Sequence, residues 1–208
     1  FSTPSLQTAM NELSNHDHSR FLTRTNHKVG RTGTLGPRAA EEGVNKGVLR
    51  EAVVIQMTWM GAPTVYYGDE AGVCGFTDPD NRRTYPWGHE DQDLIRFHKD
   101  IIALRKAHSV LRTGSIKPLE SAYNFLAYGR FSRQEQLLIL VNNNDREIHR
   151  ELSVWELGTH RSGYMRTIFE THEDGHSLGG AVYRLKTGVL EITVPKYSSM
   201  ILEFTQNL

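Results

Sequence analysis

A histidine and an aspartate stand side by side near the start of the sequence, at His16 and Asp17, and Arg20 follows three positions later. An imidazole beside a carboxylate can bind a polar ligand, and the carboxylate can stabilise developing positive charge. The residues from Asn11 to Ser14 form a strand-like lead-in to this pair. Strand ends carry the chemistry of many α/β enzymes, although an aspartate there is more often a turn residue or a helix cap. The pair is a candidate site that needs support from the rest of the chain.

A second group of residues could bind a metal by its side-chain types. It is His172-Glu173-Asp174-Gly175-His176, which matches the H-E-x-x-H signature of zinc proteases. That signature requires a helix, because only there do residues four apart share a face. Asp174 and Gly175 break helices, and strand-like sequence lies on both sides. We therefore predict a hairpin turn and no metal site. His16, Asp17 and His18 form no metal site either, since adjacent residues project apart and no third ligand is evident.

Two helices and a strand must position the first candidate site. Apolar residues from about Gly43 predict a broadly buried helix, which Gly61 is placed to end in a left-handed cap. Residues 63–67 then read as a short buried strand, and a second helix is predicted from Asp91 to His108. The apolar residues of the first helix are Val48, Ala52, Ile55 and Trp59 on one face, with Leu49, Val53 and Met57 beside it.

The pattern of the sequence changes after about Thr113, where short segments of alternating apolar and polar residues begin, separated by polar turns. This pattern predicts an antiparallel β-sandwich or barrel. The predicted strands are 123–131, 137–141, 148–152, 164–169, 189–194 and 200–204.

The bulk composition excludes several classes of protein. The 208 residues carry a formal net charge of zero, without the basic stripe of a nucleic-acid binder or the basic amphipathic helix of a membrane-surface protein. No apolar run approaches the roughly 20 residues that span a bilayer. We therefore expect neither nucleic acid nor membrane as a partner. The first residues, from Phe1, contain no initiator Met and no signal-peptide pattern, so they read as a chain entered midway. With a single cysteine, Cys74, the location stays open and the cytoplasm is favoured.

Three motifs occur in a fixed order: Asn-His-Asp at 15–17, G-x-P-x-x-Y-Y-G-x-E at 61–70 and D-P-D-N-R-R at 78–83. Together they resemble the end of the α-amylase family of glycoside hydrolases, in particular its cyclomaltodextrinase, neopullulanase and maltogenic amylase branch. The resemblance implies an α+β chain with two parts. Residues 1–110 would be the last two β/α units of a (β/α)₈ TIM barrel, and residues 111–208 a C-terminal antiparallel β-sandwich.

The resemblance also implies roles for four residues. Asp17 matches the third catalytic carboxylate of the family, which stabilises an oxocarbenium-like transition state rather than attacking. His16 matches the imidazole that hydrogen-bonds the sugar. The alternative is a histidine at a strand end whose ring hydrogen-bonds main-chain groups instead of a ligand. Asp78 and Arg82 match a pair that grips a glucose unit, and a carboxylate and a guanidinium can serve sugar hydroxyls as acceptor and donor. The alternative for this pair is a surface ion pair in a loop.

Other polar and aromatic residues near the motifs have structural interpretations. Glu70 matches a structural residue of the family, and we interpret Arg20 as a structural partner of nearby carboxylates. Trp59 lies on a buried helix face and belongs to the core by this interpretation. Trp87, in the loop, is the better candidate for stacking on a sugar ring.

Retaining glycosidases need a nucleophile and an acid/base about 5 Å apart. In the family these come from R-x-D-A-x-x-H and G-E-x-W motifs, and neither motif occurs here. A complete barrel also needs roughly 250 residues. We therefore expect a parent enzyme that cleaves α-glucosidic bonds in starch-derived α-glucans or maltooligosaccharides, and an isolated chain that is inactive. No cofactor is expected in this chain, although calcium is possible in the parent.

Two further functions stay open. One is a non-catalytic carbohydrate-binding or interaction module whose function lies in the β domain. The other is a subunit that completes a split barrel with a separate N-terminal portion. Val48, Ala52, Ile55 and Leu94 would lack their barrel partners in this chain, and an apolar patch of that kind favours a partner chain or self-association.

Overall fold

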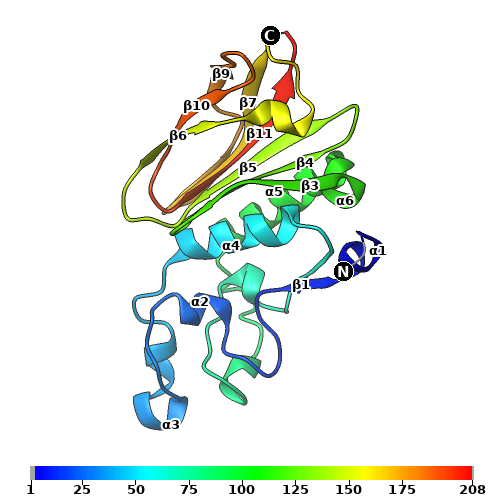
Figure 1. The fold of residues 1–208 in the computed structure, drawn as a ribbon. Helices are drawn as coiled ribbons and strands as arrows, with labels where there is room; N and C mark the ends of the chain where they lie inside the picture. Colours follow the sequence, from blue (N-terminus) through cyan, green and yellow to red (C-terminus); the bar gives the residue numbers. More distant parts are fainter. Residues whose placement is uncertain (1–2, 208) are drawn as a thin grey trace.

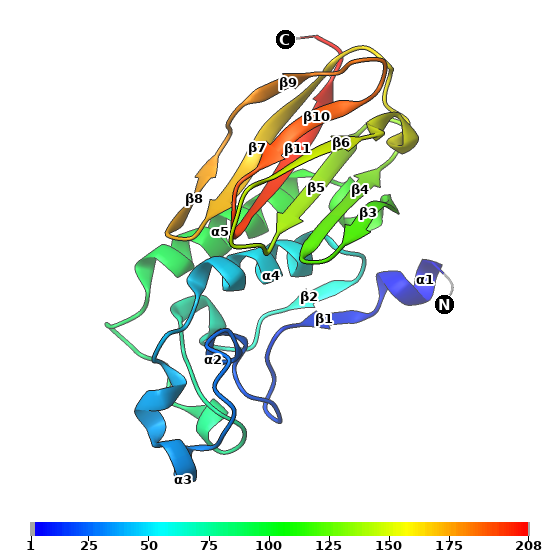
Figure 2. The ribbon, with the colours of Figure 1, turned by 60° about the vertical axis from the view of Figure 1, so that its left-hand side comes forward.

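The chain forms a layered structure in which two long helices lie against one face of an antiparallel sheet and a smaller sheet covers the other face (Figures 1 and 2). This is a computed structural model, and it describes residues 3–207. No helix in that range is long and apolar enough to span a membrane.

The two long helices begin at side-chain caps. In α4 (Lys46–Thr58), the Asn45 side chain accepts the amide of Val48 at 3.1 Å. In α5 (Gln92–Ala107), the Asp91 carboxylate accepts two amides of the first turn, both at 3.1 Å. Such caps satisfy amides that have no partner within the helix. The predicted span and cap of α5 are confirmed to within one residue.

The end of α4 differs from the prediction. Its C-terminal cap is Trp59, in an extended conformation, and not a left-handed Gly61. Gly61 does have a positive φ of 125°, but for another reason: a Cβ there would lie 2.4 Å from the carbonyl oxygen of Ala9. The glycine allows two backbone segments to approach each other closely.

Only three residues form each strand of the N-terminal region. Strands β1 (Met10–Glu12) and β2 (Ala62–Thr64) pair in parallel, with Met10 opposite Ala62 and Glu12 opposite Thr64. The predicted strand over 63–67 is therefore too long. The chain turns after Thr64, where the carbonyl of Tyr66 accepts the amide of Asp69 and that of Tyr67 accepts a hydrogen bond from Arg20.

The remaining elements before the sandwich are short. They are α1 (Thr3–Gln7), α2 (Phe21–Arg24), α3 (Thr32–Leu35), η1 (Pro37–Ala40), η2 (Asp69–Ala71), η3 (Asp80–Arg82) and α6 (Val110–Thr113).

The second half of the chain is antiparallel β-structure, as predicted. The large sheet has the order β3-β4-β5-β11-β7-β8, and β9 also pairs with β7; the small sheet pairs β10 with β6. Strands β3, β8 and β9 were missed because they lie at the rim of the sheet, where the burial that produces alternation is weak. The strands are β3 (Ser115–Ala122), β4 (Phe125–Phe131), β5 (Gln136–Asn142), β6 (Ile148–Leu152), β7 (Tyr164–His172), β8 (Gly175–Leu178), β9 (Val182–Arg184), β10 (Leu190–Val194) and β11 (Ser198–Thr205), with the 3₁₀ segment η4 (Val154–Leu157) after β6.

Strand β5 is buried along its whole length because both of its faces are covered. Its side chains alternate between two cores. Leu137, Ile139 and Val141 join the core formed with α4 and α5, whereas Leu138 and Leu140 join the core under the small sheet. The first core contains residues from both sides of position 110, including the fully buried Leu94 of α5. The expectation that Leu94 would be exposed for lack of barrel partners is therefore wrong.

Two arginines connect the end of α4 to its neighbours, one from the sheet and one from α5. Arg130 of β4 is fully buried and donates to the carbonyls of Thr58 (2.6 Å) and Gly114 (3.0 Å). Arg105 of α5 donates to those of Met57 (2.6 Å) and Gly61 (2.9 Å). The bonds to Met57 and Thr58 satisfy carbonyl groups at the C-terminal end of α4, which carries the negative end of the helix dipole.

Candidate functional site

The loop after β1 carries His16 and Asp17 at its surface. Asn15 shapes this loop, because its side-chain oxygen accepts the amides of Asp17 (2.9 Å) and His18 (3.0 Å). The His16 Nε2 atom lies 3.4 Å from the Asp17 Oδ1 atom, and the two side chains are 63% and 68% exposed. His16 thus makes its polar contact with Asp17 rather than with a main-chain group of the described residues. Both side chains are free to contact a ligand.

Arg20 fastens this loop to the segment after β2. Its side chain is fully buried and donates to the Asp69 carboxylate (3.0 Å) and to the Tyr67 carbonyl (2.6 Å). The guanidinium carbon lies 4.0 Å from the centre of the Tyr66 ring. Burial raises the pKa of Asp69, and hydrogen bonds from Ser14 and Arg20 oppose that effect. Arg20 is a structural partner of a carboxylate, as predicted, and it does not face solvent.

Asn81 fastens the third motif to the same loop. It is fully buried, and its side-chain amide donates to the carbonyls of Asn15 (3.1 Å) and His18 (2.7 Å). The main-chain carbonyl of Asn81 accepts a hydrogen bond from the Nε atom of Arg20, at 2.8 Å. The loops that bear Asp17 and the D-P-D-N-R-R motif are therefore held side by side. Sequence reasoning did not single out Asn81, although it stands inside a motif that was recognised.

The residues of D-P-D-N-R-R divide into an exposed pair and a structural pair. Arg82 Nε lies 2.5 Å from Asp78 Oδ1, and the two side chains are 49% and 51% exposed. Arg83 is the inner cation, and its guanidinium donates two hydrogen bonds to the Asp80 carboxylate, at 2.9 and 3.0 Å. Partial burial favours a higher pKa for Asp80, but hydrogen bonds from Arg83 and from the Phe76 amide outweigh it and lower that pKa. Only the first pair is accessible to a ligand.

The aromatic residues of the region differ in their exposure. Trp87 is 79% exposed, and its ring centre lies 4.5 Å from that of Tyr85. Trp59 is half-buried and packs edge-on against Tyr128 at 4.9 Å, so it belongs only partly to the core. Glu70 accepts the amide of Gly68 at 2.9 Å, which is a structural role.

The H-E-x-x-H sequence forms a hairpin, as predicted, with β7 ending at His172 and β8 beginning at Gly175. His176 Nε2 pairs with the Asp100 carboxylate at 2.8 Å and joins β8 to α5. The group of side chains in residues 3–207 whose spacing could hold a metal is instead His108, Glu135 and Glu203. Two of these already pair with each other at 2.5 Å, and Glu203 pairs with Arg166 at 2.7 Å.

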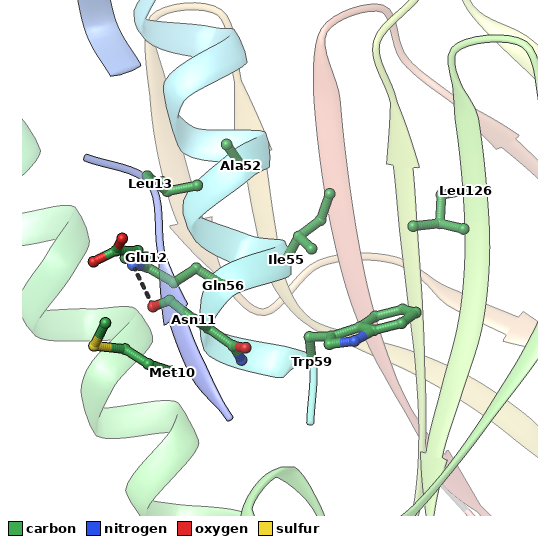
Figure 3. A pocket seen from close by; sticks show the side chains of 9 residues that line it. All are labelled: Met10, Asn11, Glu12, Leu13, Ala52, Ile55, Gln56, Trp59 and Leu126. Carbon is green, nitrogen blue, oxygen red and sulfur yellow. Dashed lines mark hydrogen bonds between the residues drawn. The ribbon is translucent and has the colours of Figure 1, made fainter. Parts of the chain in front are cut away.

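An apolar hollow of about 430 Å³ lies beside β1 (Figure 3). Ala52 and Ile55 of α4 and the capping Trp59 line one side, β1 forms another, and Leu126 of β4 completes the hollow. Gln56 joins the parts, since its amide donates to the carbonyls of Asn11 (3.1 Å) and Thr64 (2.9 Å). In the described chain β1 pairs only with β2, so one edge of β1 has no strand beside it.

Known proteins align with most of the chain, although no family model matches it. Amylopullulanase from Thermoanaerobacter thermohydrosulfuricus is 39% identical over 127 residues, which cover 61% of this chain and 8% of that protein. Neopullulanase 2 from Thermoactinomyces vulgaris is 32% identical over 196 residues, which cover 92% of this chain and 28% of that protein. The chain thus spans well under a third of the length of these relatives.

Solved structures have the same fold. The α-amylase from Geobacillus thermoleovorans, solved with acarbose, superposes with a TM-score of 0.75 at 22% identity, covering 95% of this chain and 39% of that one. A cyclomaltodextrinase superposes with a TM-score of 0.67 at 25% identity, covering 96% of this chain and 30% of that one. By sequence and by fold, this chain is a relative of the α-amylase family of glycoside hydrolases.

Proposed function

We propose that the chain is the C-terminal portion of a retaining glycoside hydrolase that cleaves α-glucosidic bonds in starch-derived α-glucans or maltooligosaccharides. Residues 1–110 supply the last two β/α units of its barrel, and residues 111–208 supply its sandwich. The observation that carries the proposal is the parallel pair β1 and β2, whose outgoing loops are held together by Arg20 and Asn81. Active sites of barrel enzymes lie in the loops at the carboxyl ends of parallel strands.

Asp17 and His16 act on the reacting sugar in this proposal. The transition state of glycoside cleavage carries positive charge near the ring oxygen, and a fixed carboxylate stabilises it. Asp17 is held in place through Asn15, which accepts the Asp17 amide, and remains accessible to substrate. The adjacent His16 ring donates or accepts a hydrogen bond with a sugar hydroxyl.

Asp78 and Arg82 bind a neighbouring glucose unit. Their ion pair is half-exposed, so its strength in water is small and sugar hydroxyls can compete for both partners. A hydroxyl accepts from the guanidinium and donates to the carboxylate. Trp87 adds an exposed ring on which a sugar can stack.

Maltotriose hydrolysis, by the chain alone and by a fusion that completes the barrel, tests the proposal. The nucleophile and acid/base motifs do not occur in this sequence, so the purified 208-residue chain is expected to show no hydrolysis. Fused to the N-terminal part of a cyclomaltodextrinase barrel, it should support cleavage, and Asp17→Asn should reduce kcat by about 10²-fold or more. Thr84→Ala, an exposed change in the same region, is the matched control and should retain activity. Hydrolysis by the chain alone would overturn the proposal.

A second candidate, a subunit that completes a split barrel, is favoured by the hollow beside β1. The hollow is lined by apolar side chains, and the open edge of β1 offers main-chain groups to another strand (Figure 3). Met10, which is 62% exposed, belongs to the same surface. The occupant is the preceding strand of a barrel, because parallel sheets are covered on both faces and paired at their edges.

Sedimentation of the isolated chain tests this second candidate. We expect concentration-dependent association that Ile55→Asp and Met10→Asp weaken, because each places a charge in the hollow. Val29→Asp is the control, since Val29 is 98% exposed and lies outside the hollow. If the chain sedimented as a monomer at all concentrations and did not bind an added N-terminal barrel portion, the split-barrel function would be contradicted.

A further inference from the structure

Three turns meet at the end of the sandwich that lies toward α4 (Figure 1). They connect β3 to β4, β5 to β6 and β10 to β11, and the strand register explains why they meet. Asn142, the last residue of β5, is opposite Phe125 of β4 and Ser198 of β11. The turns enclose an open hollow of about 420 Å³, which we call the sandwich-end hollow. It is lined by Tyr123, Asn124, Asn143, Asn144, Asp145, Arg146 and Tyr197.

Side-chain amides of two asparagines hold the walls of the sandwich-end hollow in place. The fully buried Asn142 side chain donates to the carbonyls of Arg146 (3.0 Å), Val194 (3.1 Å) and Pro195 (2.8 Å). The Asn144 side chain donates to the Asn124 carbonyl at 3.1 Å, which links the turn after β5 to the turn between β3 and β4. A site whose supporting groups are satisfied in this way is preorganised for a ligand.

Two of the lining residues have positive φ angles. Asn124 has a φ of 53° and Tyr197 a φ of 43°. A left-handed conformation is tolerated by asparagine but is uncommon for a bulky residue such as tyrosine. Such residues persist where surrounding structure fixes them, and they gather at ligand sites. Here the Tyr197 amide is held by the Asn144 carbonyl at 3.2 Å.

Several side chains that line the hollow make no hydrogen bond or ion pair within the described residues. Tyr123 is 88% exposed, and no hydrogen bond or ion pair within residues 3–207 involves its hydroxyl. The same holds for the side chains of Asn143 and Arg146 and for the Tyr197 hydroxyl. An exposed aromatic ring next to amide, guanidinium and phenol groups that the fold does not pair is available to a ligand.

The chemistry of these groups selects a neutral ligand rich in hydroxyls. Each hydroxyl both donates and accepts, and the side-chain amide of Asn143 offers the same two functions. Tyrosine rings provide flat apolar faces on which the C–H face of a sugar ring can lie. One carboxylate, Asp145, balances one guanidinium, Arg146, so the hollow has no excess charge to attract a metal ion or a polyanion. Its volume falls within the range of small-molecule pockets, about 300–1,000 Å³.

We propose that the sandwich-end hollow is a non-catalytic saccharide-binding site, with Tyr123 as its stacking platform and Asn143 as its principal hydrogen-bonding group. The ligand is a short neutral oligosaccharide, and its identification as an α-1,4-glucan rests on the proposed function. The site is separate from the loops of Asp17 and Asp78, because none of its lining residues belongs to them. It would hold a glucan chain at a distance from the cleavage point and raise its local concentration.

Titration of the ¹⁵N-labelled chain with maltoheptaose, and with cellohexaose as the comparison, tests the inference. We expect maltoheptaose to shift the backbone amides of residues 123–124 and 143–146 together with the Asn143 side-chain amide. Tyr123→Ala and Asn143→Ala should each raise the Kd at that site about tenfold, the equivalent of about 1.4 kcal/mol. Tyr123→Phe keeps the ring and should bind nearly as wild type. Tyr123 is exposed, so its replacement leaves the fold intact, which circular dichroism would verify.

The variants Asp78→Ala and Arg82→Ala separate this inference from the proposed function. If maltoheptaose still shifts the amide resonances of the sandwich-end hollow in both of these variants, the inference is supported. This holds even if binding by the Asp78 loop is never seen. If Asp78→Ala abolished maltoheptaose binding while Tyr123→Ala and Asn143→Ala bound it as tightly as the wild type, the inference would be overturned. The proposed function would still stand. Shifts produced by cellohexaose and not by maltoheptaose would overturn the assignment to α-glucans. No shift with either sugar would overturn the inference altogether.

Discussion

The side-chain amide of Asn81 donates a hydrogen bond to the carbonyl of His18, 2.7 Å away, although 63 residues separate the two in the sequence. Through this bond, the loop that carries the Asp78–Arg82 pair is fixed to the loop that carries His16 and Asp17. Neither loop has regular secondary structure beyond a 3₁₀ turn. Their relative position therefore depends on a few buried polar contacts rather than on a sheet.

Asn81→Ala is expected to lower the free energy of unfolding by about 1–3 kcal/mol, because the carbonyls of Asn15 and His18 lose their buried donor. Urea denaturation would measure the loss. Thr84→Ala, in the same region but exposed, should change the stability by less than about 0.5 kcal/mol. Equal stability of the Asn81 variant and the wild type would show that the two loops are held by other contacts.

The motifs of this region were visible in the sequence, but their internal division was not. D-P-D-N-R-R offers two acids and two arginines, and spacing alone does not tell which arginine is exposed. That distinction comes from Glu41 and from the Pro37 carbonyl, which bind Arg83 and lie more than 40 residues away in the chain. Similarly, α5 was predicted closely because Asp91 caps it locally. Strand β2 ends early because its partner β1, far away in the sequence, is only three residues long. Local signals are in the sequence, and long-range hydrogen bonds are not.

Glu51 of α4 is 3% exposed, and one of its carboxyl oxygens has no hydrogen-bond partner among the described residues. Burial raises the pKa of Glu51 from 4.5 to about 9. The folded state therefore keeps a proton that the unfolded state has lost above pH 4.5. Stability is fully present below pH 4.5 and falls as the pH rises toward 9, with a slope of up to about 1.4 kcal/mol per pH unit.

Glu51→Gln removes this titration. We expect the variant to be more stable than the wild type at pH 8 and to differ little from it at pH 4.5, as measured by urea denaturation at both values. A wild-type stability that rises between pH 5 and 8, with no change in that trend in the variant, would contradict the assignment to Glu51.

Arg130→Met is expected to destabilise the chain by about 3 kcal/mol or more, because the carbonyls of Thr58 and Gly114 would be left buried without a donor. Thermal unfolding would report the loss. Arg133→Met is the matched control, since Arg133 is exposed and lies only three residues away. It should unfold like the wild type.

Gly61→Ala is expected to cost about 2 kcal/mol or more, since alanine is strained at a φ of 125° and its Cβ would collide with the carbonyl of Ala9. The collision would also separate β1 from β2. Gly33→Ala, where a Cβ meets nothing within 4 Å, should be neutral or slightly stabilising. Denaturation midpoints of the two variants would decide whether the close approach at Gly61 is required.

The complete enclosure of β5 determines the order in which the chain opens. Amides of a strand that is paired on both edges and covered on both faces can reach solvent only when both layers come apart together. Deuterium should therefore enter β5 last, at a rate set by global unfolding. The three-residue pair of β1 and β2 should exchange first, through fluctuations that leave the sheet closed. We therefore expect the loops that carry Asp17 and Asp78, which follow β1 and β2, to fluctuate more readily than the sheet.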